Sequence, residues 1–255
     1  MSDYDRTASA RYGAGVARST TGAIDQGLRA FMLGVYNYMA IGLGLTGVVA
    51  YAAYKMAVVE VGGRIVGLTD VGAALYQSPL RWVVIFAPLV VVMLFSARRN
   101  SMSVGAARGV FLLFAALIGL SLSTVFVVFT QGSIFRVFFE TAAAFGALSL
   151  YGYTTRRDLS PVGSFLLMGL FGLIIASVVN IFLHSTGLQW ALSIVGIGIF
   201  AGLTAWDTQA IKDSYFAGDA YEASEKKAIF GALRLYLDFI NLFQQLLFLM
   251  GNRRS

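Results

Sequence analysis

Seven stretches of this chain are each long and apolar enough to cross a lipid bilayer as a helix. A spanning helix needs about 20 mainly apolar residues, because the hydrocarbon core is about 30 Å thick. The stretches cover roughly 31–54, 82–97, 109–130, 134–155, 164–184, 190–211 and 229–250. Backbone polar groups in lipid must find partners within the chain, which favours helices. The sequence therefore predicts an all-α membrane protein with seven transmembrane helices.

The composition agrees with this class and excludes several kinds of site. The chain is 58% hydrophobic and 13% charged, whereas a soluble domain is about 45–50% apolar and about 25% charged. It has no cysteine and only one histidine, His184, which excludes disulfides, thiolate catalysis and metal clusters of cysteine or several histidines. The basic residues are spread over many loops, so we expect no nucleic-acid partner. We expect no resident metal or cofactor, and the bilayer itself is the predicted partner.

The polar ends of the chain suggest its division and its orientation. Residues 1–28 are polar and rich in Ser, Gly and Ala, which predicts a disordered cytosolic tail ahead of a transmembrane domain over 29–255. With the N-terminus in the cytosol, twelve Lys and Arg residues fall on the cytosolic side and six on the other. Positive charge accumulates on the cytosolic side of membrane proteins. The sequence thus predicts a cytosolic N-terminus and, with seven spans, a C-terminus on the opposite side.

Two aspartates stand out because they lie inside predicted spans. Asp207 falls near the cytosolic end of the sixth span, and Asp238 lies within the seventh. A charged side chain at the centre of a spanning helix costs about 2.5–3.5 kcal/mol on insertion scales. Each therefore needs a partner, water or a function. Consecutive spans run in opposite directions, so both carboxyl groups fall in the cytosolic half of the bilayer, where they can meet.

A polar stripe on the seventh span indicates that this helix faces the interior. Asn241 and Gln245 follow Asp238 at i+3 and i+7, and these spacings share one face of a helix. Such a stripe is typical of a helix at the centre of a bundle or beside a water-filled path. Thr204 precedes Asp207 by three residues and could support it from the same face.

The aspartate pair has two interpretations, and the residues alone leave both open. Two carboxyl groups close together in a medium of low dielectric constant would share a proton and titrate as a unit. When both are ionised, they repel each other or capture a cation. In the other interpretation, each aspartate pairs with a nearby Arg or Lys and merely ties helices together.

Three motifs carry a resemblance to a known family. The segments GALSLYGYTTRRDLS (146–160), GLTAWDTQAIK (202–212) and GALRLYLDFINLF (231–243) resemble signatures of the Bax inhibitor-1 family, specifically its bacterial inner-membrane branch. The resemblance implies seven helices with the seventh at the centre, surrounded by helices one to six. It also implies a multi-pass protein of the cell inner membrane.

The resemblance also implies a function. Members of the family are associated with a pH-sensitive leak of cations, chiefly calcium, and their acidic pair falls on Asp207 and Asp238 in this chain. A basic residue at the cytosolic end of the second helix is implied as a latch, and Arg99, ahead of Arg98, is our first choice for it. Calcium takes six to eight oxygen ligands, so the pair would bind it only weakly and transiently. Weak binding suits a leak, since the ion must also leave.

Two other functions need consideration. Some bacterial members are thought to bind and restrain a membrane-anchored quality-control protease, so the chain could be a regulator without transport. Paired aspartates also serve intramembrane aspartyl proteases, but those enzymes need a Gly-x-Gly-Asp type of context, and here Asp238 lies in LYLDF. We therefore expect no enzymatic activity.

Overall fold

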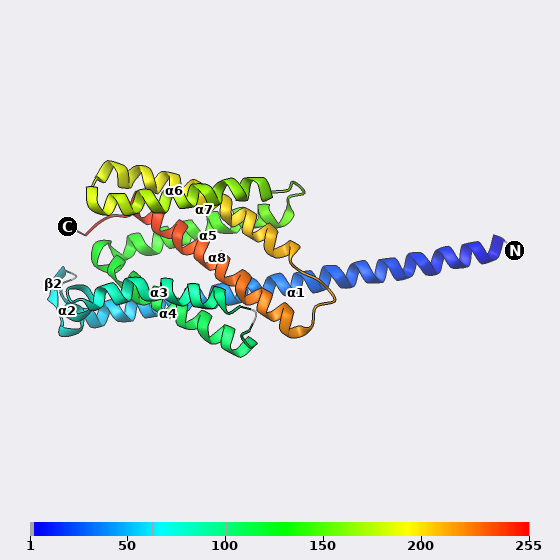
Figure 1. The fold of residues 1–255 in the computed structure, drawn as a ribbon, viewed down its shortest axis with the longest axis horizontal. Helices are drawn as coiled ribbons and strands as arrows, with labels where there is room; N and C mark the ends of the chain where they lie inside the picture. Colours follow the sequence, from blue (N-terminus) through cyan, green and yellow to red (C-terminus); the bar gives the residue numbers. More distant parts are fainter. Residues whose placement is uncertain (1–2, 63, 100, 255) are drawn as a thin grey trace.

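The computed structural model describes residues 3–62, 64–99 and 101–254, with side chains from Gln26 onward. Within these residues, seven helices are long and apolar enough to cross a membrane, which confirms the predicted fold class. These are α1 (Asp3–Ala57), α3 (Leu80–Ala97), α4 (Val104–Val128), α5 (Gln131–Thr154), α6 (Ser160–Leu183), α7 (Thr186–Asp213) and α8 (Tyr221–Met250). Figure 1 shows the N-terminus and the C-terminus at opposite ends of the bundle, as an odd number of spans requires.

Helix α1 is longer than the first predicted span. Its helical backbone begins at Asp3, and the part apolar enough to span a membrane is Gln26–Ala57. The sequence predicted a disordered tail over 1–28, whereas this backbone is helical from Asp3 on. The division of the chain into a tail and a transmembrane domain stays a prediction.

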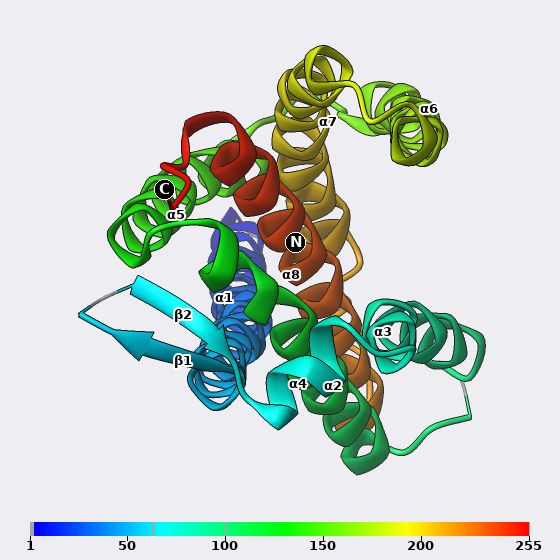
Figure 2. The ribbon, with the colours of Figure 1, turned by 90° about the vertical axis from the view of Figure 1, so that its left-hand side faces the viewer.

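Helix α8 lies at the centre of the bundle. Figure 2 shows it inclined between α1, α4, α5 and α7, while α6 packs on the outer side of α7. Half of its most apolar window is buried inside the molecule, compared with 11% for α3 and for α6. The central position of the seventh span agrees with the polar stripe, because a helix with polar groups in mid-membrane avoids the lipid face.

Aromatic side chains interlock α8 with its neighbours. The ring of Tyr236 lies 5.9 Å from those of Phe111 and Phe114 on α4, and its hydroxyl is 2.6 Å from Thr46 Oγ1 on α1. Phe239 packs against Phe145 of α5 at 5.5 Å. Helices in lipid associate through van der Waals packing and interhelical hydrogen bonds, so these contacts fix the position of α8.

A small residue sets the crossing of α5 and α7. A Cβ atom added at Gly152 on α5 would lie 2.1 Å from the carbonyl oxygen of Ala205 on α7. Only glycine permits this approach of the two backbones. The close crossing holds α7 firmly beside the centre of the bundle, two residues before Asp207.

The first and second spans are joined by a small folded cap that the sequence analysis did not predict. It consists of the hairpin β1 (Val58–Val61) and β2 (Arg64–Leu68), followed by the short helix α2 (Asp70–Tyr76). Thr69 caps α2, since its hydroxyl accepts a hydrogen bond from the amide of Gly72 at 3.1 Å. The cap lies at the same end of the molecule as the C-terminus (Figure 1).

Candidate functional site

The structure places Asp207 of α7 and Asp238 of α8 side by side inside the bundle. Both residues are buried, at 8% and 5% exposed, and each lies close enough to the other for their carboxyl groups to interact electrostatically. Asp207 Oδ1 and Asp238 Oδ2 are buried and have no hydrogen-bond partner among the described residues. A buried carboxylate oxygen without a hydrogen bond is costly, so the polar groups of this pair are incompletely satisfied.

Arg234 is a third member of the site, which the sequence analysis did not connect to the pair. Its Nη1 lies 3.3 Å from Asp207 Oδ1, and its guanidinium lies 5.9 Å from the ring centre of Trp206. Arg234 precedes Asp238 by four residues, so both project from one face of α8. This spacing is visible in the sequence and could have indicated Arg234 as a member of the site. The arginine supplies the ionic tie of the second interpretation, but one cation faces two carboxyl groups.

Two of the three predicted supporting residues are satisfied within their own helices. Thr204 donates its hydroxyl to the carbonyl of Phe200 at 2.7 Å, and Asn241 donates to the carbonyl of Leu237 at 2.8 Å. Gln245 differs, because its side chain packs at Gly196 of α7, where an added Cβ would meet it at 2.9 Å. Its Oε1 is buried and lacks a partner among the described residues.

The two arginines predicted as a latch lie at the end of α3. Arg98 is the C-cap of α3, with its amide donating to the carbonyl of Leu94 at 3.0 Å, and the guanidinium of Arg99 lies 5.9 Å from the ring centre of Phe230 on α8. Within the described part of the chain, the recorded ion pair of Asp207 is with Arg234 and not with either of them. Their role as a latch stays a prediction.

A row of hydroxyl groups, also missed from the sequence, reaches α7 beside the aspartates. Tyr36 of α1 lies 2.6 Å from Ser149 of α5, which lies 3.0 Å from Thr208 of α7. Thr208 follows Asp207 directly. Tyr36 and Ser149 also line a cavity of about 520 Å³ between α1 and α5. No motif links these three residues, because they come from three different helices.

The first turns of α8 are tied to α1 and α4 through one carboxylate. Glu225 accepts hydrogen bonds from the hydroxyl of Tyr38 and from Arg108 Nη2, both at 2.5 Å. This contact lies nine residues before Arg234 on the same helix. It anchors the end of α8 that leads into the aspartate pair.

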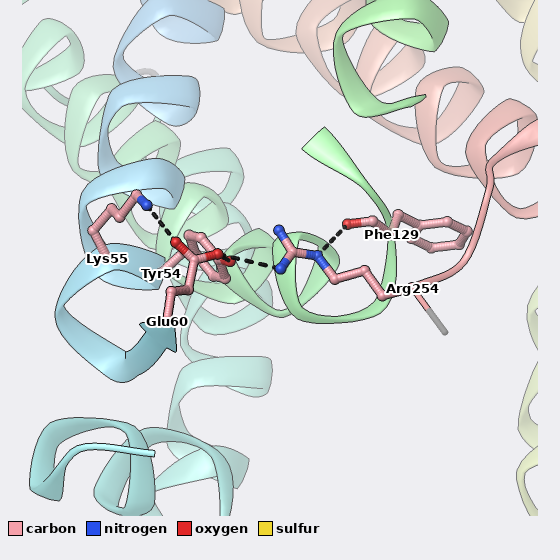
Figure 3. Close-up of polar contacts among 5 residues, drawn as sticks. All are labelled: Tyr54, Lys55, Glu60, Phe129 and Arg254. Carbon is pink, nitrogen blue, oxygen red and sulfur yellow. Dashed lines mark hydrogen bonds and ion pairs between the residues drawn. The ribbon is translucent and has the colours of Figure 1, made fainter. Parts of the chain in front are cut away.

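A second carboxylate cluster lies at the opposite end of the bundle, on the folded cap (Figure 3). Glu60 accepts hydrogen bonds from Lys55 Nζ at 2.6 Å, from the Tyr54 hydroxyl and from Arg254 Nη1 at 3.2 Å. Arg254 also donates to the carbonyl of Phe129 at 3.3 Å. The hydrogen bonds from Lys55 and Tyr54 lower the pKa of Glu60 to about 2. This cluster attaches the C-terminus to the cap and to the loop between α4 and α5.

These features define a multi-pass α-helical membrane protein with a partly neutralised acidic pair between its last two spans. The family model described as inhibitor of apoptosis-promoting Bax1 matches residues 28–255. The chain belongs to this family, which confirms the resemblance seen in the three motifs.

Bacterial relatives match the chain over most or all of its length. The chain is 42% identical to a protein of Rickettsia prowazekii over the whole of both chains. It is 44% identical to the inner membrane protein YbhL of Escherichia coli K12, with 89% of this chain and 94% of the relative covered. A membrane protein of Streptococcus pyogenes is 34% identical, with the same coverage.

Proposed function

We propose that this protein is a pH-sensitive cation leak, with calcium as its principal ion, in which Asp207 and Asp238 form the sensor. The observation that carries the proposal is the burial of two neighbouring carboxyl groups beside Arg234. The name of the Escherichia coli relative supports a location in the bacterial inner membrane. The distribution of basic residues supports a cytosolic N-terminus.

The number of protons on the pair sets the charge at the contact between α7 and α8. With one proton shared, the remaining carboxylate and Arg234 neutralise each other. Without that proton, two carboxylates face one guanidinium, and the site has a net negative charge. A buried net charge is unfavourable unless it gains a counter-ion. A cation from the aqueous phase can supply that charge, so protonation and cation entry compete at the same place.

The oxygen ligands at the aspartate pair suit the passage of calcium better than its storage. Within the described residues, no group of three or more His, Asp and Glu side chains is placed to hold a metal ion. A calcium ion at the pair would therefore take most of its oxygen ligands from water. An ion held in this way leaves readily, which conduction requires.

Calcium flux into liposomes across a range of pH tests the proposal. Wild-type protein should pass calcium with a rate that depends on pH, and Asp207→Asn and Asp238→Asn should each change that dependence. Asp213→Asn is the matched control, because Asp213 is an exposed aspartate at the end of the same helix α7. Flux with the same pH dependence in wild type and both variants would reject the proposal.

The regulator of a membrane-anchored protease is the competing function. It predicts that pull-down of the protein from native membranes recovers a protease, that removal of 1–28 abolishes the capture, and that both Asp→Asn variants still capture it. Recovery of a protease in this pattern, together with no calcium flux from the wild-type protein, would replace the leak with this function.

A further inference from the structure

We propose that one anionic phospholipid binds in a cleft beside α1 and α5 at the end of the bundle where the C-terminus lies. This cleft consists of a basic pocket and an adjoining apolar groove, and it is distinct from the cavity lined by Tyr36 and Ser149. The phosphate would lie at Arg64 and Arg253, and an acyl chain would lie along the apolar part of the cleft. Neither Asp207 nor Asp238 lines this site, although Phe239, the residue after Asp238, lies on the α8 wall of its apolar part.

The polar part of the site is a basic pocket between the cap, α5 and the C-terminal segment. Its volume is about 750 Å³, and its charged lining residues are Lys55, Glu60, Arg64, Arg253 and Arg254. Lys55 and Arg254 are paired with Glu60. Arg64 and Arg253 are exposed and have no ion-pair partner among the described residues. Among the described lining residues, four cations face one anion. This excess of positive charge suits the pocket to phosphate, which arginine binds through directed hydrogen bonds.

The apolar part is a groove of about 530 Å³ lined by α1, α4, α5 and α8. Gly44 and Gly47 lie on its α1 wall, and a Cβ atom added at either would meet nothing within 4 Å. On the α5 wall, Phe135 and Phe139 are 55% and 69% exposed. The groove is therefore open space between two spans, at a depth that hydrocarbon chains occupy.

The pocket and the groove adjoin along two helices. On α1, Tyr51 lines the groove and Lys55, one turn later, lines the pocket, with Lys55 Nζ 5.7 Å from the Tyr51 ring. On α4, the successive residues Phe126 and Val127 line the groove and the pocket. Positive charge at the end of the bundle thus continues into an apolar groove toward its middle. A phospholipid has the matching order of groups, with a charged headgroup followed by apolar acyl chains. Free phosphate would occupy only the pocket.

Lipid binding to the purified full-length protein, measured by native mass spectrometry in detergent, tests the headgroup end. Phosphatidylglycerol should bind more tightly than phosphatidylcholine with the same acyl chains. Arg64→Gln and Arg253→Gln should each weaken phosphatidylglycerol binding about fivefold, the effect of about one basic residue at a membrane surface. The control Arg81→Gln removes an exposed arginine at the same end but outside the pocket, and it should leave binding unchanged. Equal losses in all three variants would indicate a diffuse basic surface and overturn the proposal.

Two further measurements test the acyl end. Gly47→Leu should fill the groove and weaken phosphatidylglycerol binding, while Gly172→Leu, at an exposed glycine of α6 with equal free space, should not. Glycerol phosphate should fail to displace the lipid at equal concentration. Full displacement by glycerol phosphate, or unchanged binding in Gly47→Leu, would show that only the headgroup is bound, and the phospholipid site would be wrong.

Discussion

Carboxylates at the two ends of this bundle have opposite surroundings. Glu60 accepts hydrogen bonds from Lys55, Tyr54 and Arg254, so two cations and one hydroxyl group stabilise a single carboxylate. Asp207 and Asp238 lie beside Arg234, which makes an ion pair with Asp207 Oδ1, while Asp238 Oδ2 has no hydrogen-bond partner among the described residues. The first arrangement holds a fixed anion and fastens the C-terminus to the cap. The second arrangement has too few hydrogen-bond donors for its carboxyl oxygens. It therefore contributes little to stability, but it is suited to gaining or losing a proton.

The largest stability effect should come from removing Arg234, the cation that the described residues place at the pair. Arg234→Gln leaves two buried carboxyl groups without a counter-charge. Breaking a buried ion pair costs about 3–5 kcal/mol, and the exposure of Arg234 reduces this to about 2 kcal/mol. Unfolding in detergent at neutral pH measures it. The double variant Arg234→Gln/Asp207→Asn should recover most of the loss, because the unpaired charge is gone. A double variant less stable than either single one would show that the arginine acts through packing on Trp206.

Removal of the fixed anion at the other end should have a smaller effect. Glu60→Gln leaves Lys55 and Arg254 near the surface, where water can solvate them, so we expect a loss of about 1 kcal/mol in the free energy of unfolding. Limited proteolysis should also cut the C-terminal segment faster, since Arg254 loses its partner on the cap. Glu222→Gln, at an exposed acid in the first turn of α8, is the control. A loss as large as that of Arg234→Gln would remove the contrast between the two ends.

The pH dependence of Glu60 sharpens the same comparison. Its pKa is lowered from 4.5 to about 2 in the folded protein, so its stabilising contribution is complete above the unfolded pKa and is lost as pH falls toward the folded one. The stability difference between wild type and Glu60→Gln should therefore be constant from about pH 7 to about pH 5 and shrink below that. Denaturant unfolding at several pH values measures it. A difference that changes between pH 6 and 7 would show that Glu60 titrates there, contrary to its surroundings.

The sequence predicted those features of the molecule that depend on the residues of one segment alone. Spans are set by length and apolar composition, so all seven were found. The central place of the seventh span agrees with the burial of Asp238, whereas Asn241 and Gln245 of the same stripe are only half-buried. Arg234 was within reach of the same spacing argument but was not connected to Asp207, because a cross-helix partner depends on the relative rotation of α7 and α8. The hydroxyl row and the cluster around Glu60 join three or more separate segments. Such contacts follow from packing and have no signature in any one stretch.

Gln245 should show the smallest effect and tests where the polar site on α8 ends. Its Oε1 is buried without a partner among the described residues, so replacing the amide by an apolar group removes a cost and loses no hydrogen bond at that atom. Gln245→Met keeps the length of the side chain against Gly196, and the free energy of unfolding should stay within about 0.5 kcal/mol of wild type or rise. Asn241→Leu, at a residue bonded within α8, is the comparison. A loss above about 1 kcal/mol in Gln245→Met would mean that the amide is hydrogen-bonded through water. The polar site would then extend along α8 from Asp238 to Gln245, seven residues further than the aspartate pair. The fully hydrogen-bonded cluster at Glu60 would then be compared with this longer site.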